Sequence, residues 1–443
     1  MFYSLLLPIL ITTFGVMILI KLRLFFILHP KRCLKKFIRA LKSPEAKGAL
    51  SLSLAGTLGV GNIVGIAYGI SVCGEGIVLW LLVSSIFSMA LKYAESALCA
   101  SGRDGSFGGI MYVIRSGFGK YSVFFSSLYA SLILILSLTM GSSLQLRSAI
   151  DCIDKQYSAT VYIFFALFIL IVYLSTLGGA KGIKSACKYI IPLGAVLYSL
   201  LTLSVIILNV EKLPSLLIKI VRSAFNFRSA GGGVSIFLFT RCLKEGFSRA
   251  LLSNEAGSGT SGIAHSSCES TSPAEAGLFG ISEVFFDTVL LCPLTGFAIL
   301  LAPQDGAISG NGAEIVKGTL LHLGSFTTPL LFLCITLFAF STVICWYYYG
   351  SVAAGCLSPR VLKLYPPLFF LSLFSSLIID TSLMIQLSDG ILFFLSLISL
   401  SAIIKNSDRL VYLSENEGLI TKRGYAKEGF QERKASMQAR PQK

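Results

Sequence analysis

Two glycine-rich segments interrupt long apolar runs of this sequence, and both carry groups that can bind a small ligand or an ion. The first is AGTLGVGNIVG, residues 55–65, which holds four glycines, a threonine and an asparagine. The second, RALLSNEAGSGTSGIAHSS at 249–267, contains Asn254, Glu255, Gly257, Gly259 and Gly262. Each glycine costs a helix interior about 1 kcal/mol relative to alanine. Both segments therefore predict a break in a helix.

A break in a buried helix frees backbone groups that can act as ligands. Free N–H groups attract a carboxylate, and free carbonyl oxygens attract a cation. Irregular backbone inside a membrane is tolerated where it lines a cavity. Glu255 adds weight to the second segment, because a carboxylate within an apolar span is costly and usually functional. The competing interpretation is close helix packing, since Gly61 and Gly65 form a GxxxG pattern.

A pair of hydroxyls lies in a third apolar run, LFAFSTVICWYYYG at 337–350. Ser341 and Thr342 either bond back to a helix carbonyl or supply the hard oxygens that Na⁺ needs. Trp346 follows Thr342 by just over one helical turn. Its aromatic run either belongs to an interfacial belt or faces the same site as the hydroxyls.

Three further polar side chains occur within predicted spans. Gln145 lies near the outer end of an apolar run, either as a loop-proximal amide or as a ligand. Asp287 and Asp389 are carboxylates that either satisfy neighbouring helix ends and hydroxyls or take part in function. The sequence leaves both alternatives open for each residue.

The composition indicates what kind of element positions these groups. The 443 residues are 54% hydrophobic and 13% charged, whereas soluble domains carry about 25% charged residues. The mean hydropathy is +0.78. Several apolar runs reach or approach the roughly 20 residues that cross a bilayer. The sequence therefore predicts an all-α polytopic membrane protein.

The formal charge of +15 does not point to nucleic acid. Basic residues concentrate at 21–47 and after residue 404, as expected of cytoplasmic loops and tails. The 11 cysteines are scattered without a CxxC pair, so neither a disulfide framework nor a metal site is predicted. The apolar run from Phe2 has no basic region before it, which argues for a retained helix rather than a signal peptide.

Hydropathy and turn residues predict eleven spans. They lie near 3–25, 50–72, 76–99, 121–147, 157–176, 187–209, 233–264, 275–302, 328–355, 364–379 and 383–404. The N-terminus is expected outside a bacterial-type inner membrane and the C-terminus in the cytoplasm. In this topology, inside segments, among them 92–120, hold most of the 37 basic residues.

The two glycine-rich breaks fall in the second and seventh spans. After one extra helix, the remaining ten spans divide into two sets of five, each beginning with a broken helix. Because five is odd, the second set must be inverted relative to the first, as in inverted-repeat transporters. The expected divisions are the extra helix with its basic linker (1–49), two repeats (50–209 and 210–404) and a basic, polar, mobile tail (405–443).

Taken together, these motifs resemble those of the alanine or glycine:cation symporter family. AGTLGVGNIVG is similar to its first glycine signature, and GFSRALLSNEAGSGTSGIAH to its most characteristic segment. FAFSTVICWYYYG matches a third signature, and TLGGAKGIKSACKYIIP a weaker fourth. The resemblance implies a LeuT-like fold of the amino-acid/polyamine/organocation type. It also implies import of a small neutral amino acid, alanine or glycine, with Na⁺ by alternating access.

The resemblance assigns roles to residues of this chain. It implies a Na⁺ site formed by carbonyls of Ala55, Leu58 and Phe338 and by the hydroxyls of Ser341 and Thr342. The substrate-binding residues it implies are Thr57, Gly59, Gly61, Asn62, Gln145, Asn254, Glu255, Gly257 and Trp346. The first break would bind the substrate carboxylate and the second its ammonium group, with the indole restricting the pocket to small substrates. No cofactor is expected besides Na⁺ as coupling ion, and a monomer is compatible with this architecture.

Two departures from the family pattern concern specificity and the last helix. Ser142 follows Gly141 where the family usually has asparagine, and the residues after Asp389 differ from the family's ending. Three rival interpretations remain. One keeps the fold but couples to H⁺ through Glu255, Asp287 or Asp389; another is an intramembrane hydrolase using His265 and Ser266. The third, a passive channel, lacks a filter motif.

Overall fold

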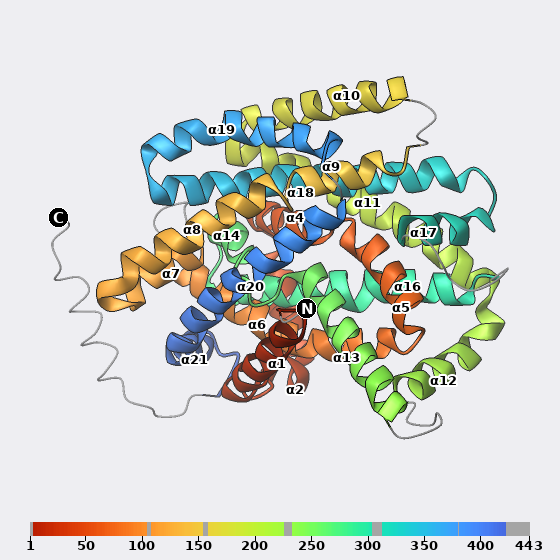
Figure 1. Ribbon diagram of the computed structural model, residues 1–443. Coiled ribbons are helices and arrows are strands. Elements are labelled where there is room, and N and C mark those ends of the chain that lie inside the picture. The colour runs from red at the N-terminus through yellow and green to blue at the C-terminus, as the bar shows by residue number, and fades with distance from the viewer. Residues whose placement is uncertain are drawn as a thin grey trace.

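The computed structural model describes residues 3–103, 108–153, 158–225, 233–303, 312–379 and 381–421. These residues form helices and connecting turns, and none of them belongs to a β-strand. In Figure 1 the long helix α18 (Thr327–Leu357) crosses the molecule, with α10 (Ser158–Leu177) and α19 (Pro359–Leu373) along one edge. The opposite edge in this view holds α12 (Leu213–Ala224) and α13 (Gly233–Asn254). The all-helical expectation is confirmed.

Seven of the described helices are long and apolar enough to cross a membrane. They are α6 (Ile77–Ser101), the unit Gly119–Ile150, α10 from Ala159, α11 (Gly179–Leu208), the unit Pro273–Leu301, α18 and α20 (Thr381–Lys405) from Leu383. An eighth results if α4 (Pro44–Thr57) and Gly61–Cys73, bent by 46° relative to each other, form one span. The protein is therefore a multi-pass membrane protein.

The other predicted spans also coincide with helices. These are α1 (Tyr3–Lys21), α13 followed by α14 (Ser261–Ser266), and α19 with 15 residues. Four charged residues in α13 and the 15-residue length of α19 keep these two helices from meeting the same criterion. Each of the eleven predicted segments thus contains a helix among the described residues.

Local sequence sets where several helices begin. Ser43 precedes Pro44 and its hydroxyl accepts the N–H of Ala46, at the start of α4. Ser272 and Glu275 form a capping box at the start of α15 (Pro273–Val284). Such caps satisfy N–H groups that the first turn leaves without a helical partner.

Helix packing brings the two halves of the chain together. Helix α6 packs against α13, α14 and α15, and α4 packs against α11, α14 and α18. Segments around both predicted breaks are thereby buried in the middle of the fold. This placement positions the candidate site described below.

Two expectations from the charge pattern need revision. Lys92 is not a loop residue, because it lies inside α6 and is fully buried. The predicted tail begins with a helix, α21 (Ser407–Asn416), tied to the N-terminal region by ion pairs. Lys21 Nζ lies 2.9 Å from Asp408 Oδ1, and Arg23 lies 3.3 Å from Glu415. Residues 422–443 of that tail lie outside the described residues.

Candidate functional site

The first glycine-rich segment ends one helix and starts another. Helix α4 stops at Thr57, and helical geometry resumes at Gly61 as a short π-helix, η1 (Gly61–Gly65), followed by α5 (Ile66–Cys73). Between them the N–H of Gly59 donates to the carbonyl of Thr57 (2.9 Å) and to Asn62 Oδ1 (3.3 Å). The carbonyl oxygens of Ala55 and Leu58 accept no hydrogen bond from the described residues. The predicted backbone acceptors are therefore available here.

The glycines of this segment have different surroundings. A Cβ at Gly61 or Gly65 would meet no atom of the described residues within 4 Å, so the GxxxG packing interpretation is wrong for this pair. A Cβ at Gly56 would lie 2.9 Å from the Tyr349 hydroxyl and 3.2 Å from Cys345 Sγ. Close approach to α18 thus occurs at Gly56, before the break, and not at the GxxxG pair.

Helix α18 places one of the two predicted hydroxyls, that of Thr342, beside the first break. A Cβ at Gly59 would lie 3.4 Å from Thr342 Oγ1, and this buried hydroxyl has no hydrogen-bond partner among the described residues. The Ser341 hydroxyl donates to the carbonyl of Phe338 at 2.9 Å. All five predicted Na⁺ ligands, Ala55, Leu58, Phe338, Ser341 and Thr342, are buried. Phe338, Ser341 and Thr342 lie in α18, and Ala55 and Leu58 lie in and just after α4.

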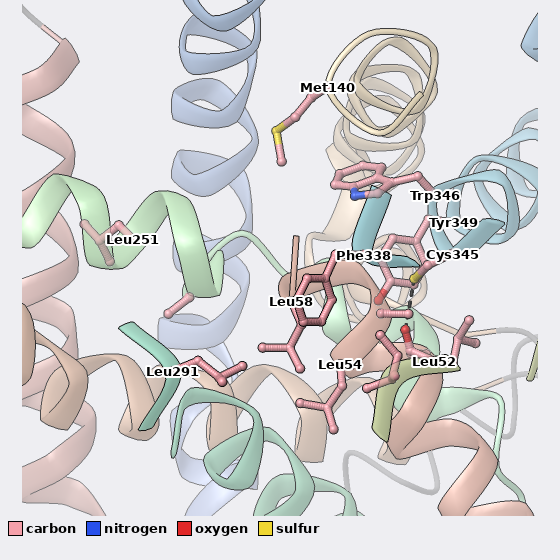
Figure 2. Close-up of a cluster of buried hydrophobic side chains, with 14 of the residues drawn as sticks. Leu52, Leu54, Leu58, Met140, Leu251, Leu291, Phe338, Cys345, Trp346 and Tyr349 are labelled. Atoms are coloured by element: carbon pink, nitrogen blue, oxygen red, sulfur yellow. Dashed lines mark hydrogen bonds between the residues drawn. The ribbon is translucent and has the colours of Figure 1, made fainter. Parts of the chain in front are cut away.

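Figure 2 shows the apolar surroundings of this region. Cys345 of α18 donates to the carbonyl of Leu52 at 3.0 Å, which fixes α18 to α4 before the break. The Trp346 and Tyr349 rings lie 5.5 Å apart, centroid to centroid, at 69°. Apolar walls of this kind strengthen electrostatic contacts to any ion or charged group held between them.

Gln145 and Trp346 lie near the same break. Gln145, in α9 (Ser143–Ile150), donates from Nε2 to the Met140 carbonyl at 3.2 Å. Its Oε1 lies 3.4 Å from the Cβ position of Gly59 and has no partner among the described residues. Trp346 is fully buried, and its Nε1 is likewise without a partner in the described part of the chain. Unpaired buried polar atoms are rare and indicate a missing ligand or water.

Gly141 explains how the indole fits. A Cβ at this position would lie 2.2 Å from Trp346 Cγ, so only glycine can sit there. The neighbouring Ser142, the departure from the family pattern, contacts Ser372 of α19 instead, with 3.1 Å between the two hydroxyl oxygens. The serine thus faces a different helix from the one that carries Trp346.

The second glycine-rich segment also separates two helices. Helix α13 ends at Asn254 and α14 begins at Ser261. Glu255 (φ +50°), Gly257 (+81°) and Gly259 (+85°) adopt left-handed backbone, which is common for glycine but unusual for glutamate. The Glu255 carboxylate accepts a hydrogen bond from Thr260 Oγ1 at 2.7 Å. The chain thus turns sharply here, inside the protein.

The predicted ligands of the second break are engaged unequally. Asn254 donates to Thr288 Oγ1 (2.9 Å) and accepts from the N–H of Ala256 (3.0 Å). In the described part of the chain, no group donates to the carbonyl oxygens of Ala256 and Gly257. The side chains at this break therefore serve its own geometry, and the backbone carbonyls are the available acceptors.

Asp287 connects the two breaks. It lies in a second π-helix, η4 (Phe285–Leu291), between α15 and α16 (Cys292–Leu301). Its carboxylate accepts hydrogen bonds from Asn62 Nδ2, from Ser253 Oγ (2.9 Å to each oxygen) and from Thr288 Oγ1 (2.6 Å). The sequence left open whether Asp287 satisfies neighbouring groups, and the structure shows that it does. Asn62 belongs to the first break, and Ser253 lies at the end of α13, beside the second. Asp389 is half-buried on α20.

The histidine considered for a hydrolase has other partners. His265 Nε2 contacts Glu283 and lies 3.1 Å from Ser53 Oγ. The adjacent Ser266 hydroxyl donates to the Gly262 carbonyl at 2.5 Å. His265 therefore does not activate Ser266 in this arrangement.

Two charged residues at the second break were missed by the sequence analysis. Glu95 Oε2 accepts the N–H groups of Gly257 and Gly259, and Lys92 lies beside Glu95. The signal was present, since these are two charges less than one turn apart in an apolar run. Lys92 was instead grouped with the basic residues of the inside segment 92–120, so the charged pair was not recognised.

The sequence profile of the Sodium:alanine symporter family matches residues 1–416. The chain belongs to the sodium:alanine symporter family. This membership makes it a Na⁺-coupled amino-acid transporter rather than an enzyme, as the resemblance implied.

Named relatives of this symporter come from several microbes. The sodium/alanine symporter AgcS of Methanococcus maripaludis is 31% identical over 318 residues, covering 68% of each chain. An uncharacterized transporter of Haemophilus influenzae is 31% identical over 316 residues, again 68% of each. The probable sodium/glutamine symporter GlnT of Bacillus subtilis is 29% identical over 370 residues, 80% of this chain and 75% of the relative.

Two solved structures are similar to the symporter in fold. MhsT in complex with L-phenylalanine has a TM-score of 0.50 at 15% identity, covering 83% of this chain and 98% of its own. A manganese transporter of Eremococcus coleocola has a TM-score of 0.51 at 13% identity, covering 82% and 75%. Both are LeuT-fold transporters, so the symporter has LeuT-fold neighbours.

Proposed function

We propose that this symporter imports a small neutral amino acid, alanine or glycine, together with Na⁺ by alternating access. The observation that carries the proposal is the set of unpaired oxygens between α4 and α18. Carbonyls of Ala55 and Leu58 and the hydroxyl of Thr342 have no hydrogen-bond partner in the described part of the chain. Hard oxygen atoms of this kind replace the hydration shell of a small cation.

The same geometry supports a place for the amino acid beside the ion. Gly61 is exposed and has open space around its Cβ position, so the backbone at the start of η1 is approachable. We infer that N–H groups around Thr57–Gly61 meet the substrate carboxylate, beside Gly59 and Asn62, whose own N–H groups are bonded within the break. The substrate ammonium group would lie toward the second break, at Asn254–Gly257 with Glu255.

Gln145 and Trp346 complete the proposed pocket. The unpaired Oε1 of Gln145 lies 3.4 Å from the Cβ position of Gly59, and the bulk of the buried indole limits the size of a side chain that fits. A methyl group or hydrogen fits such a space more easily than a glutamine side chain. This steric argument favours alanine or glycine.

The proposed architecture has eleven spans, with one extra helix followed by two inverted sets of five. The helix pairs on either side of the breaks, α4 with α5 and α13 with α14, would be the two discontinuous helices. The divisions at 1–49, 50–209, 210–404 and 405–443 follow from this arrangement. We propose an outside N-terminus and a cytoplasmic C-terminus in a bacterial-type inner membrane.

Uptake into proteoliposomes tests the function. Labelled alanine, glycine, serine and glutamine are offered with an inward Na⁺ gradient, with a pH gradient in Na⁺-free buffer, or with neither. We expect accumulation of alanine or glycine above equilibrium with the Na⁺ gradient. Accumulation driven by the pH gradient alone would replace Na⁺ by H⁺ in the proposal. Preference for glutamine, or mere equilibration, would contradict the substrate or the symport mechanism.

A further inference from the structure

Four buried titratable side chains cluster beside the second break, outside the predicted ligand set. They are Lys92 and Glu95 of α6, His265 of α14 and Glu283 of α15, each at most 1% exposed. Burying a charge is expensive unless its partners compensate for the lost water. The partners of these four side chains therefore indicate which parts of the protein the cluster stabilises.

Glu95 is bound to the backbone of the break. Its Oε2 accepts the N–H of Gly257 at 3.1 Å and the N–H of Gly259 at 3.0 Å. The positive φ angles of both glycines turn these N–H groups toward one side of the chain, as in a backbone concavity that binds anions. Hydrogen bonds from N–H groups to a carboxylate are stronger than those between neutral partners.

Lys92 supplies the opposite charge. Its Nζ lies 3.4 Å from Glu95 Oε1 and 3.2 Å from Glu283 Oε2, and it also contacts the Ser261 hydroxyl at the start of α14. Helix α15 packs closely against α6: a Cβ added at Gly280 of α15 would lie only 2.5 Å from the Lys92 carbonyl oxygen of α6. The Glu95 carboxylate is thus carried by one of two tightly packed helices, α6 and α15, rather than by a loop.

The hydrogen bonds continue to the helix that carries the first break. His265 contacts Glu283 and lies 3.1 Å from Ser53 Oγ in α4, four residues before Thr57. The cluster therefore joins α4, α6, α14 and α15. A displaced second break would have to separate Glu95 from both glycine amides.

We propose that Glu95 is a positioning residue for substrate binding, an inference that rests on the proposed function. Its carboxylate occupies the N–H groups of Gly257 and Gly259, which would otherwise compete for the carboxylate of an amino acid. The carbonyl oxygens of Ala256 and Gly257 then face the ligand. Glu95 thereby gives the second break a preference for the ammonium group and fixes the direction in which the substrate lies.

The test uses Glu95→Gln in the full-length protein, with two readouts. Because Lys92 stays paired with Glu283, we expect this variant to fold. Hydrogen–deuterium exchange of the peptide that contains Gly257 and Gly259 should become faster. The KM for alanine should rise roughly tenfold, the size of losing one charge-assisted hydrogen bond. Half-activation by Na⁺ at saturating alanine should stay unchanged, since the proposed ion ligands lie at the first break.

Glu275→Gln is the matched control. Glu275 also accepts a backbone N–H, that of Ser272, but at the start of α15 and away from the breaks. We expect wild-type exchange at the second break and wild-type KM for this variant. If Glu95→Gln left the exchange of that peptide and the KM at wild-type values, the positioning role would be overturned. An equal loss of Na⁺ activation and alanine affinity would also overturn it, because that pattern indicates general damage.

A double variant covers a failure of Glu95→Gln to fold. Lys92→Met with Glu95→Gln removes one positive and one negative charge together, and Glu283, which also loses Lys92, keeps its contact with His265. We expect this protein to fold and to show the same fast exchange at the second break; wild-type exchange would overturn the proposal. Hydrogen–deuterium exchange does not require transport. A wild-type protein that takes up no alanine would therefore contradict the proposed function, whereas wild-type exchange at Gly257 and Gly259 in the variants would overturn the role of Glu95.

Discussion

The side-chain amide of Asn62 donates a hydrogen bond to the carboxylate of Asp287, 225 residues further along the chain. Asn62 belongs to the first break, and Ser253, which donates to both oxygens of the same carboxylate, immediately precedes the end of α13 at the second. Two segments that each lack regular helical hydrogen bonds thus share one acceptor. A movement of either break in the transport cycle must stretch or rearrange this shared contact.

Asp287→Asn should therefore impair transport strongly. An amide offers one acceptor oxygen where the carboxylate offers two, so donors from Asn62, Ser253 or Thr288 lose a partner. Losing a hydrogen bond to a charged group costs about 1.5–3 kcal/mol. We expect the maximal rate of alanine uptake to fall at least about tenfold, the rate equivalent of 1.4 kcal/mol. Asp151→Asn, just after the end of α9 and exposed, is the control and should transport normally. Normal uptake by Asp287→Asn would contradict a shared role.

Ser341→Ala combined with Thr342→Ala should weaken the response to Na⁺ much more than it lowers expression. The double variant removes two of the five proposed oxygen ligands. We expect the Na⁺ concentration for half-maximal uptake to rise roughly tenfold or more, with each lost ligand contributing about 1 kcal/mol. Uptake is measured against Na⁺ concentration, and expression by immunoblot. Ser351→Ala is the control. It removes a hydroxyl of the same helix that donates to the Tyr348 carbonyl, and it should leave Na⁺ activation intact. Unchanged activation in the double variant would remove the site assignment.

Gly141→Ala should destabilise the protein through Trp346. The added Cβ would overlap the indole, whose Cγ lies 2.2 Å away, and overpacking of this kind costs about 1–3 kcal/mol. Thermal unfolding in detergent should show a lower midpoint. Gly65→Ala makes the same chemical change in open space and should unfold near the wild-type temperature. Equal midpoints for both variants would argue against the tight contact.

Trp346 also allows a direct measurement of ligand binding. The chain has two tryptophans, so Trp80→Phe leaves Trp346 as the single indole. If the unpaired Nε1 faces the substrate, alanine added with Na⁺ should shift the emission of this variant, because indole fluorescence responds to the polarity around the ring. Trp346→Phe, which keeps Trp80, serves as the control and should show no such shift. A flat response in the first variant, with uptake retained, would place the substrate elsewhere.

Much of this protein could be predicted from its sequence because the membrane constrains the chain strongly. A span needs about 20 apolar residues, so hydropathy located a helix at every predicted segment. Glycines disrupt a helix locally, so the two glycine-rich segments predicted that helices would end there, as α4 does at Thr57 and α13 at Asn254. The longest signatures also identified the family. These properties depend on neighbours in the chain, which a sequence displays directly.

Contacts between distant residues were decided by the tertiary structure. Asp287 was ambiguous because its partners, Asn62 and Ser253, come from other helices. Gly61 and Gly65 matched a packing pattern, but no described atom lies within 4 Å of a Cβ built on either, and Gly56 makes the close contact instead. Lys92 and Glu95 were passed over although each is a charge in an apolar run. Their meaning depends on the two glycine amides that the second break turns toward Glu95. The sequence determines where the helices break; packing determines which freed groups are bound within the protein and which stay available to a ligand.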